Sequence, residues 1–208
     1  CANAHAAYDP ENEKWRVFGD PTEAALAVFA EKIGFHKNDL ERESPKTDEM
    51  PFDYKTKYHA TAHSAGERAF LTVVGAPEVV LKLSSKKAEG DSARELSKKD
   101  KDELERVFFE MSQEGLRVLA FAVKENAPKN IGQEDIHSLT FVGFVGMKDA
   151  LRPEVKDATQ RAVLAGVRVV MITGDHKLTA QSIARDATIY HEGDGVLTGA
   201  EVDLLSDD

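Results

Sequence analysis

Apolar residues recur at helical spacing in several segments, and most of these segments begin with a recognisable helix start. Residues 20–23 have the sequence Asp-Pro-Thr-Glu, in which the aspartate can cap a helix, the proline suits its first position and the glutamate can reach back to the capping backbone. The apolar spacing that follows predicts a helix as far as residue 33, where Gly34 ends it. Similar signals predict further helices that begin at Pro77, Ser97 and Pro153.

Short apolar runs between the helices predict strands. The clearest runs are residues 70–74, 116–123 and 139–145. Residues 52–63 lack helical periodicity and are rich in Tyr and Thr, which favours a strand or one arm of a hairpin. Two polar stretches, residues 37–51 and 84–93, predict surface loops.

The pattern of the chain changes near Lys148. From there a helix ending at Gly166, an apolar run over residues 167–172, a loop and a further helix follow one another. A buried strand between helices is typical of a doubly wound parallel sheet, whereas the earlier strands and helices lack strict alternation and favour an antiparallel α+β sheet. We therefore predict two domains, residues 1–148 and 149–208, in a chain of the α/β (α+β) class.

Composition and charge narrow the classes of protein that the chain could represent. Lys and Arg number 27 and Asp and Glu number 37, which gives a net charge of −10 and argues against binding to nucleic acid or an anionic membrane. No apolar run approaches the roughly 18–20 residues of a membrane-spanning helix. The first residues lack a signal-peptide pattern, and the single cysteine, Cys1, cannot form an internal disulfide. Since the chain starts without Met and ends on Ser-Asp-Asp, we expect an excised fragment that is itself soluble.

One loop stands where an open α/β sheet places its ligands, beyond the carboxyl end of a buried strand. It consists of Thr173, Gly174 and Asp175. The glycine allows a tight turn, the threonine offers a hydroxyl and an amide, and the N-terminus of the following helix favours an anion such as phosphate. Alternatively, Asp175 only caps the helix that begins near Lys177.

Several other kinds of site lack their motifs in this sequence. There is no G-x-x-x-x-G-K-[ST] phosphate loop, no G-x-G-x-x-G after a strand and no G-x-S-x-G nucleophile elbow. The seven histidines do not have the spacing of a metal site. His59 and His63 are four residues apart, but on a strand that spacing does not favour chelation, so we expect structural or solvated roles for both.

Six short segments, taken in order, resemble those of the P-type cation-transporting ATPases. They are GDPTEAAL at residues 19–26, MPFD at 50–53, GAPE at 75–78, GLRVLA at 115–120, KDALRP at 148–153 and MITGDHKLTA at 171–180. The resemblance implies a nucleotide-binding domain with an antiparallel sheet flanked by helices, followed by part of a Rossmann-like phosphorylation domain of the haloacid-dehalogenase type. The family's D-K-T-G-T and T-G-D-G-x-N-D segments do not occur here. Without the aspartate of the first of these, we expect this chain alone not to hydrolyse ATP through a phosphoenzyme.

The resemblance also implies a set of site residues, with ATP and Mg²⁺ as cofactors. Glu23 would accept a hydrogen bond from the adenine amino group, and Phe52 would stack on the adenine ring. Lys57 and Gly75 would line the pocket, and Arg117 would contact the phosphates. In the whole pump, the transferred phosphoryl group and its Mg²⁺ would be held with the help of Thr173, Gly174 and Asp175. Asp149 and Arg152 would lie at the hinge between domains. Without the family context, Phe52 would be interpreted as a core aromatic residue and Arg117 as an exposed strand residue.

Two departures from the family pattern predict weaker ATP affinity. Val74 occupies the position where the lysine of the family's K-G-A-P-E motif is expected. Residues 54–56 replace a more arginine-rich pattern after Phe52, which leaves Lys57 as the clearest basic match.

For the whole protein, the resemblance implies coupling of ATP hydrolysis, through an aspartyl phosphate, to cation transport across a membrane, with calcium favoured over protons or sodium. The implied partners are ATP and the remaining phosphorylation, actuator and transmembrane domains of the same chain, with this part on the cytoplasmic side and no nucleic acid. A nucleotide-binding or sensor module without transport activity is the alternative. A soluble phosphatase of the haloacid-dehalogenase type is disfavoured, because no Asp-x-Asp follows a first strand.

Overall fold

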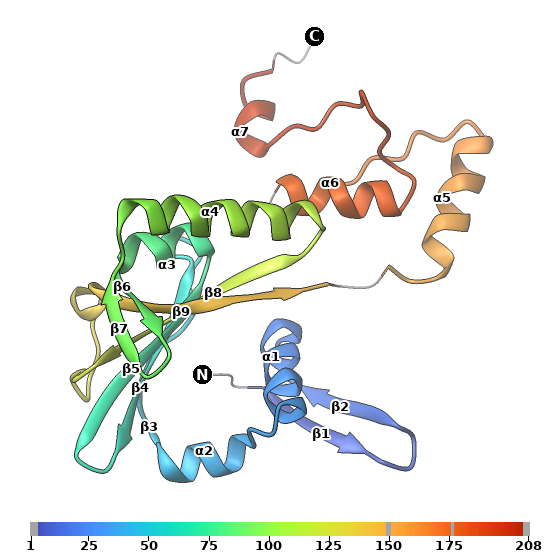
Figure 1. Cartoon of the computed structure of the whole chain (residues 1–208). Helices are drawn as coiled ribbons and strands as arrows, with labels where there is room; N and C mark the ends of the chain where they lie inside the picture. The colour runs from blue at the N-terminus through green and yellow to red at the C-terminus, as the bar shows by residue number, and fades with distance from the viewer. Residues whose placement is uncertain (1–3, 149–150, 176, 206–208) are drawn as a thin grey trace. The chain divides into compact units, whose positions relative to one another are not determined.

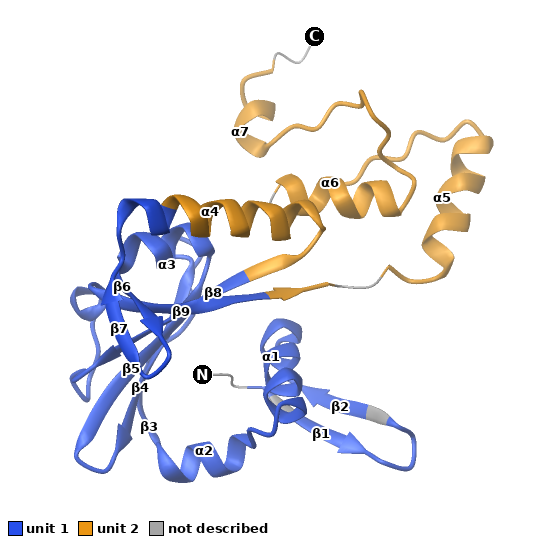
Figure 2. Cartoon of the chain, in the orientation of Figure 1, with its two compact units in different colours: residues 1–101, 119–145 blue, residues 102–118, 146–208 orange. Residues whose placement is uncertain are grey.

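The structure, a computed structural model, describes residues 4–148, 151–175 and 177–205. Helices and strands follow one another along the chain without strict alternation (Figure 1). They form two compact units, a first unit of residues 1–101 and 119–145 and a second unit of residues 102–118 and 146–208 (Figure 2). The domain boundary at residue 148 stays a prediction.

A seven-stranded sheet is the main element of the first unit, with the strand order β3-β4-β5-β8-β9-β6-β7. The strands are β3 (Lys46–Met50), β4 (Tyr58–Ala65), β5 (Arg68–Gly75), β6 (Ser84–Glu89), β7 (Ser92–Glu95), β8 (Arg117–Glu125) and β9 (Leu139–Met147). The pairs β3–β4, β4–β5, β5–β8 and β6–β7 are antiparallel, whereas β6 and β9 are parallel. The mixed sheet and its flanking helices confirm the α/β class, and β5, β8 and β9 confirm the three clearest predicted strands.

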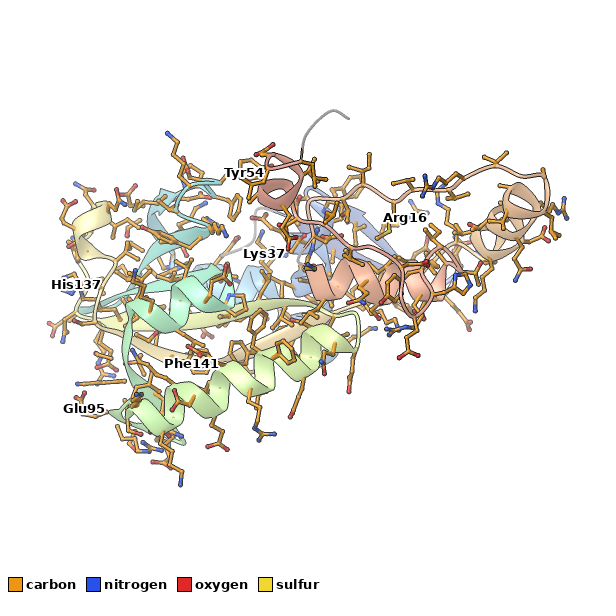
Figure 3. All side chains as sticks on the ribbon, turned by 90° about the horizontal axis from the view of Figure 1, so that it is seen from above. Arg16, Lys37, Tyr54, Glu95, His137 and Phe141 are labelled. Carbon is orange, nitrogen blue, oxygen red and sulfur yellow. The ribbon has the colours of Figure 1, made fainter. Side chains whose placement is uncertain are left out.

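Alternate residues of neighbouring strands supply the core of the first unit. The buried positions are Ala60 and Ala62 in β4, Leu71 and Val73 in β5, Ala120 and Ala122 in β8, and Leu139 and Phe141 in β9. The helix α3 (Pro77–Leu83) adds Val80, which is completely buried. Figure 3 shows Phe141 inside this unit, whereas Glu95 and His137 lie at its surface.

A hairpin and two helices precede the sheet in the chain. These elements are β1 (His5–Asp9), which pairs with β2 (Lys14–Phe18), and the helices α1 (Pro21–Lys32) and α2 (Lys37–Glu43). The predicted start of α1 is confirmed, because Oδ1 of Asp20 accepts hydrogen bonds from the N–H groups of Thr22 and Glu23 at 2.9 and 3.2 Å. Glycine is required just before this cap, since Gly19 has a φ of +108° and a Cβ there would lie 2.9 Å from Cα of Ala4.

Two stretches that were predicted as loops form regular structure. Residues 37–51 contain α2 and β3, and residues 84–93 contain β6 and the start of β7. β3 and β7 are the outer strands of the sheet, so each pairs on one side only. The side chains of an outer strand can face water, and polar residues suit that position. The loop predictions were wrong because polarity alone does not distinguish such a strand from a loop.

The second unit contains most of α4 (Lys98–Gln113) and three later helices. These are α5 (Glu154–Leu164), α6 (Lys177–Asp186) and α7 (Gly199–Val202). The helices predicted to begin near Pro153 and Lys177 are thus confirmed as α5 and α6. α6 buries Thr179, whose hydroxyl donates a hydrogen bond to the carbonyl oxygen of Leu116 at 3.1 Å.

Residues 167–172, which were predicted as a buried strand, have neither helical nor strand structure. Val167 is 55% exposed, Val170 is 69% exposed and Ile172 is 93% exposed. A parallel strand that is buried on both faces needs neighbouring strands for its N–H and C=O groups. Within the described ranges, no strand pairs with this segment. The prediction was wrong because apolar composition alone does not supply these hydrogen-bonding partners.

Candidate functional site

The loop of residues 51–57, between β3 and β4, exposes two aromatic side chains. Phe52 is 53% exposed and Tyr54 is 89% exposed. Their ring centroids are 5.3 Å apart and their planes make an angle of 85°, which is an edge-to-face arrangement. Asp53 orders the turn, because its Oδ1 accepts a hydrogen bond from the N–H of Lys55 at 2.6 Å and its carbonyl oxygen accepts one from the N–H of Lys57 at 2.7 Å. Phe52 is therefore not a core residue, and its ring has surface left for a flat ligand.

Lys57 and Gly75 meet where the start of β4 lies opposite the end of β5. Tyr58 and Gly75 are paired in this ladder, and the N–H of Ala76 donates to the carbonyl oxygen of Lys57 at 2.9 Å. A Cβ on Gly75 would lie 2.5 Å from that oxygen, so glycine is needed for the two strands to approach in this way. The ammonium of Lys57 lies 3.4 Å from Oε1 of Glu78, at the start of α3.

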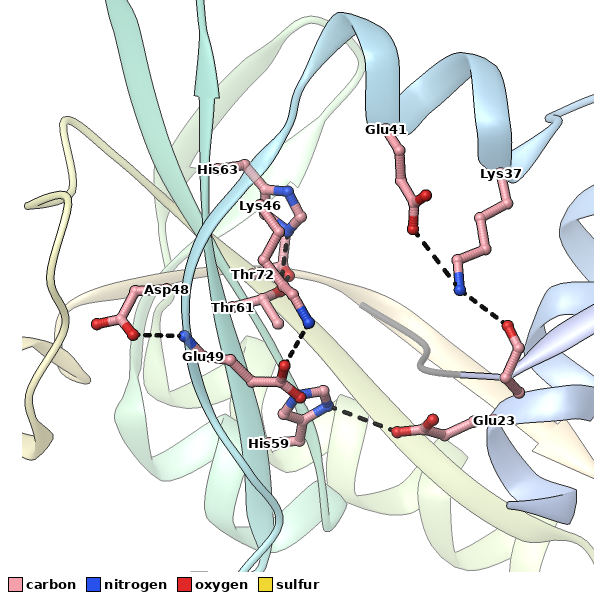
Figure 4. Close-up of polar contacts among 11 residues, drawn as sticks. Glu23, Lys37, Glu41, Lys46, Asp48, Glu49, His59, Thr61, His63 and Thr72 are labelled. Atoms are coloured by element: carbon pink, nitrogen blue, oxygen red, sulfur yellow. Dashed lines mark hydrogen bonds and ion pairs between the residues drawn. The ribbon is translucent and has the colours of Figure 1, made fainter. Parts of the chain in front are cut away.

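Glu23, in the first turn of α1, faces the start of β4. Its Oε1 lies 3.9 Å from Nδ1 of His59, and Nε2 of the same imidazole lies 2.9 Å from Oε1 of Glu49 on β3 (Figure 4). The ammonium of Lys46 forms an ion pair with Glu49. His59 was expected to have a structural or solvated role, so this contact was not predicted. The signal that could have found it is the run of polar residues at every second position of β4.

Four of the residues that the resemblance implies for nucleotide binding gather around the start of β4. They are Glu23 beside His59, Phe52 in the preceding loop, Lys57 directly before the strand and Gly75 across the ladder. Val74, which takes the place of the expected lysine, is only 8% exposed. Its side chain belongs to the core and offers no charge to a ligand. The roles of the four residues toward a nucleotide stay predictions.

Arg117 and the loop of residues 173–175 lie in the second unit. Nη2 of Arg117 donates a hydrogen bond to Oδ1 of Asp175, and the hydroxyl of Thr173 donates one to Oδ2 at 3.0 Å. The hydrogen bond from Arg117 is the main cause that lowers the pKa of Asp175 below its usual value of 3.8; partial burial opposes it and Thr173 adds to it. Asp175 is therefore an ionised carboxylate at neutral pH, next to the exposed Gly174.

The resemblance implies two hinge residues, Asp149 and Arg152, of which the structure describes only Arg152. Arg152 is exposed, and its carbonyl oxygen accepts a hydrogen bond from the N–H of Val155 at 3.0 Å. Asp149 lies outside the described residues. Within the part of the chain that is described, no three His, Cys, Asp or Glu side chains are grouped so that they could hold a metal ion. The helices found there are also too short or too polar to cross a membrane.

Comparison with known proteins assigns the chain to a family. Residues 1–154 match the family described as P-type ATPase, cytoplasmic domain N. This match covers the whole of the first unit, including the residues around the start of β4. The chain belongs to the P-type ATPase family.

The chain is similar to part of several longer proteins that are named as ATPases. The chain is 35% identical over 199 residues to calcium-transporting ATPase 1 of Lactococcus lactis, an alignment that covers 95% of this chain and 23% of that protein. It is 40% identical over 187 residues to cation-transporting ATPase pma1 of Synechocystis, covering 88% of this chain and 20% of the relative. It is 33% identical over 228 residues to the sodium/potassium exporting P-type ATPase cta3 of Schizosaccharomyces pombe, covering 100% and 21%. The chain thus spans 20% to 23% of the length of these relatives.

Proposed function

We propose that the first unit binds ATP through Glu23, Phe52, Lys57 and Gly75. The observation that supports this most strongly is the exposed ring of Phe52 in the loop that leads into β4, where a carboxylate and an ammonium group also lie. These groups fit the parts of ATP: the ring stacks on the base, the carboxylate accepts from the amino group and the ammonium attracts the phosphates. Gly75 allows β4 and β5 to lie close together, and this close approach fixes the backbone of Lys57 at the start of β4.

Arg117 serves the phosphate end of the nucleotide in this proposal. A guanidinium is a planar cation with several N–H donors, which suits a bidentate contact to a phosphate. In the first unit, the buried Val74 supplies no charge to a nucleotide. We therefore infer that the affinity for ATP is lower than it would be with a lysine at this position.

We further propose that residues 1–148 form a nucleotide-binding domain and residues 149–208 part of a phosphorylation domain of the haloacid-dehalogenase type. The helices α5 and α6 support this, because they lie before and after the loop of residues 173–175 as the sequence predicted. Thr173, Gly174 and Asp175 then lie at the transferred phosphoryl group, with Asp149 and Arg152 at the hinge. One ionised carboxylate beside substrate phosphates is a donor set that suits Mg²⁺, which supplies charge neutralisation when bound.

For the whole protein we propose a membrane cation pump in which this chain lies on the cytoplasmic side. The first unit holds ATP so that a carboxylate oxygen of an aspartate elsewhere in the whole protein, outside residues 1–208, can attack its terminal phosphorus. ADP then leaves with the bridging oxygen. Their contribution is positioning, which dominates phosphoryl transfer. Calcium is the favoured cation, followed by protons or sodium, since relatives are named as calcium-transporting and as sodium/potassium exporting.

The proposal is tested by adding ATP to the isotope-labelled chain and following its backbone amide signals. We expect shifts at Glu23, Phe52, Lys57 and Gly75. Phe52→Ala is expected to weaken binding by about 5-fold to 150-fold, which corresponds to the loss of about 1–3 kcal/mol of stacking. Phe35→Ala is a matched control, because Phe35 is 55% exposed but follows the C-terminal end of α1, whereas Glu23 lies in the first turn of that helix. Absence of shifts at millimolar ATP, or equal weakening by both substitutions, would contradict the proposal.

A further inference from the structure

One face of β4 carries polar side chains at three alternate positions, His59, Thr61 and His63. Two of them, Thr61 and His63, bond to neighbouring uncharged polar groups. The imidazole of His63 contacts the carbonyl oxygen of Ser44 at 3.1 Å and the hydroxyl of Thr61 at 2.9 Å, and that hydroxyl lies 2.8 Å from the hydroxyl of Thr72. His59 differs from the other two because both of its partners are carboxylates.

The imidazole of His59 lies between two carboxylates that come from different elements. Nε2 is 2.9 Å from Glu49 on β3, and Nδ1 is 3.9 Å from Glu23 on α1 (Figure 4). The His59 side chain is 11% exposed, and those of Glu49 and Glu23 are 23% and 26% exposed. Lys46 holds Glu49 from the other side. The imidazole is thus anchored on the sheet and faces Glu23, the one member of this group that resides on a helix.

We propose that His59 is a positioning residue of the nucleotide site, which holds the carboxylate of Glu23 where it accepts a hydrogen bond from the exocyclic amino group of adenine. This rests on the proposed function, because Glu23 has a base to contact only if the first unit binds ATP. The consequence is selectivity among bases. A carboxylate in a fixed place favours adenine, whose six-position carries an N–H donor, and repels guanine, whose six-position carries an oxygen acceptor.

The physical reason for such a partner is the freedom of the glutamate side chain. Glu23 has three rotatable side-chain bonds, and an unheld carboxylate is spread over several rotamers. A protonated imidazole carries an N–H on each nitrogen, so with Nε2 held by Glu49 it attracts the Glu23 carboxylate across 3.9 Å and reduces this spread before the base arrives. An amide can replace either imidazole nitrogen separately, because the amide of asparagine lies near the position of Nδ1 and that of glutamine near the position of Nε2.

The experiment compares the affinities for ATP and GTP of the unsubstituted chain, of three single variants at His59 and Glu23, and of one double variant. His59→Asn keeps a donor toward Glu23, and His59→Gln keeps only the donor toward Glu49. We expect His59→Asn to retain the preference for ATP within about twofold. We expect His59→Gln to reduce it by about fivefold, which is the order of effect for losing an ion pair worth about 1 kcal/mol. In the background of Glu23→Gln, the His59→Gln substitution is expected to change the preference no further, because its effect passes through Glu23.

Thermal melting of each variant shows that it is folded, and a general loss of structure would weaken ATP and GTP alike and leave their ratio unchanged. An unchanged ratio in folded His59→Gln overturns the positioning role and leaves ATP binding intact. An equal loss of preference in His59→Asn and His59→Gln, or a further loss in the Glu23→Gln background, also overturns it. If the unsubstituted chain binds neither nucleotide, the proposed function itself fails, and the inference fails with it.

Discussion

Replacing Gly75 by alanine tests the packing that places Lys57 at the site. The new Cβ would lie 2.5 Å from the carbonyl oxygen of Lys57 and 2.6 to 2.7 Å from Cβ and Cα of Tyr58, none of which can move without the backbone of β4. Restoring an ordinary contact requires a shift of the strand by about 1 Å. Overpacking of this kind costs about 1–3 kcal/mol, and strain on the hydrogen bond from Ala76 to Lys57 adds about 1 kcal/mol. We therefore expect Gly75→Ala to lower the free energy of unfolding by about 2–4 kcal/mol and to weaken ATP binding.

Urea unfolding followed by tryptophan fluorescence measures this loss. The chain has a single tryptophan, Trp15, which lies on β2 and reports on the first unit. Gly143→Ala is the matched control, because Gly143 lies in β9 of the same sheet and a Cβ there meets nothing within 4 Å. The control is expected to keep or slightly raise its free energy of unfolding, since alanine reduces the conformational entropy of the unfolded chain. Equal stability of Gly75→Ala and the unsubstituted chain, or equal loss in both variants, would refute the packing argument.

Three further predictions concern single side chains. Asp20→Ala removes the cap of α1 and is expected to lower the free energy of unfolding by about 1 kcal/mol, seen as a lower urea midpoint; an unchanged midpoint would show that the cap is unimportant. Asp175→Asn removes a carboxylate whose pKa is lowered by Arg117. This carboxylate therefore stabilises the unsubstituted chain fully at pH values above its ordinary pKa of 3.8. The stabilisation is lost as the pH falls through the lower pKa of the folded state. Denaturation between about pH 3 and 7 checks this, and an advantage that grows in acid would contradict the sign. Tyr54→Ala removes the ring edge that contacts Phe52 and is expected to weaken ATP binding by about 2-fold to 10-fold in the same titration, whereas unaltered affinity would exclude a role for this pair.

The parts of the fold that the sequence predicted correctly are those with local signals. The start of α1 followed from an aspartate, a proline and a glutamate in order, and the structure shows the aspartate capping the helix. β5 followed from a short apolar run that ends at Gly75. The outer strand β3 escaped prediction because its side chains are polar and its strand structure depends on pairing with β4, which local composition does not show. Residues 167–172 were wrong for the converse reason, since an apolar run forms a strand only where a neighbour pairs with it.

The candidate site divides in the same way. The resemblance implied five nucleotide-binding residues. The structure places Glu23, Phe52, Lys57 and Gly75 around the start of β4, whereas Arg117 belongs to the second unit. His59 was missed because a histidine on a strand shows its partners only when the neighbouring strand and helix are in place. Its contacts to the carboxylates of Glu49 on β3 and Glu23 on α1 depend on the register of β3 against β4 and on the packing of α1. Neither of these can be predicted from the residues next to His59 in the sequence.

Stacking of adenine on Phe52 can be observed through nuclear Overhauser effects between ATP and the chain. With ATP bound to the isotope-labelled chain, we expect transfer from the adenine ring protons to the ring protons of Phe52, and none to the ring of Phe35. Transfer from adenine only to residues away from the loop of residues 51–57 would contradict the stacking, as would the absence of any transfer from a nucleotide shown to be bound.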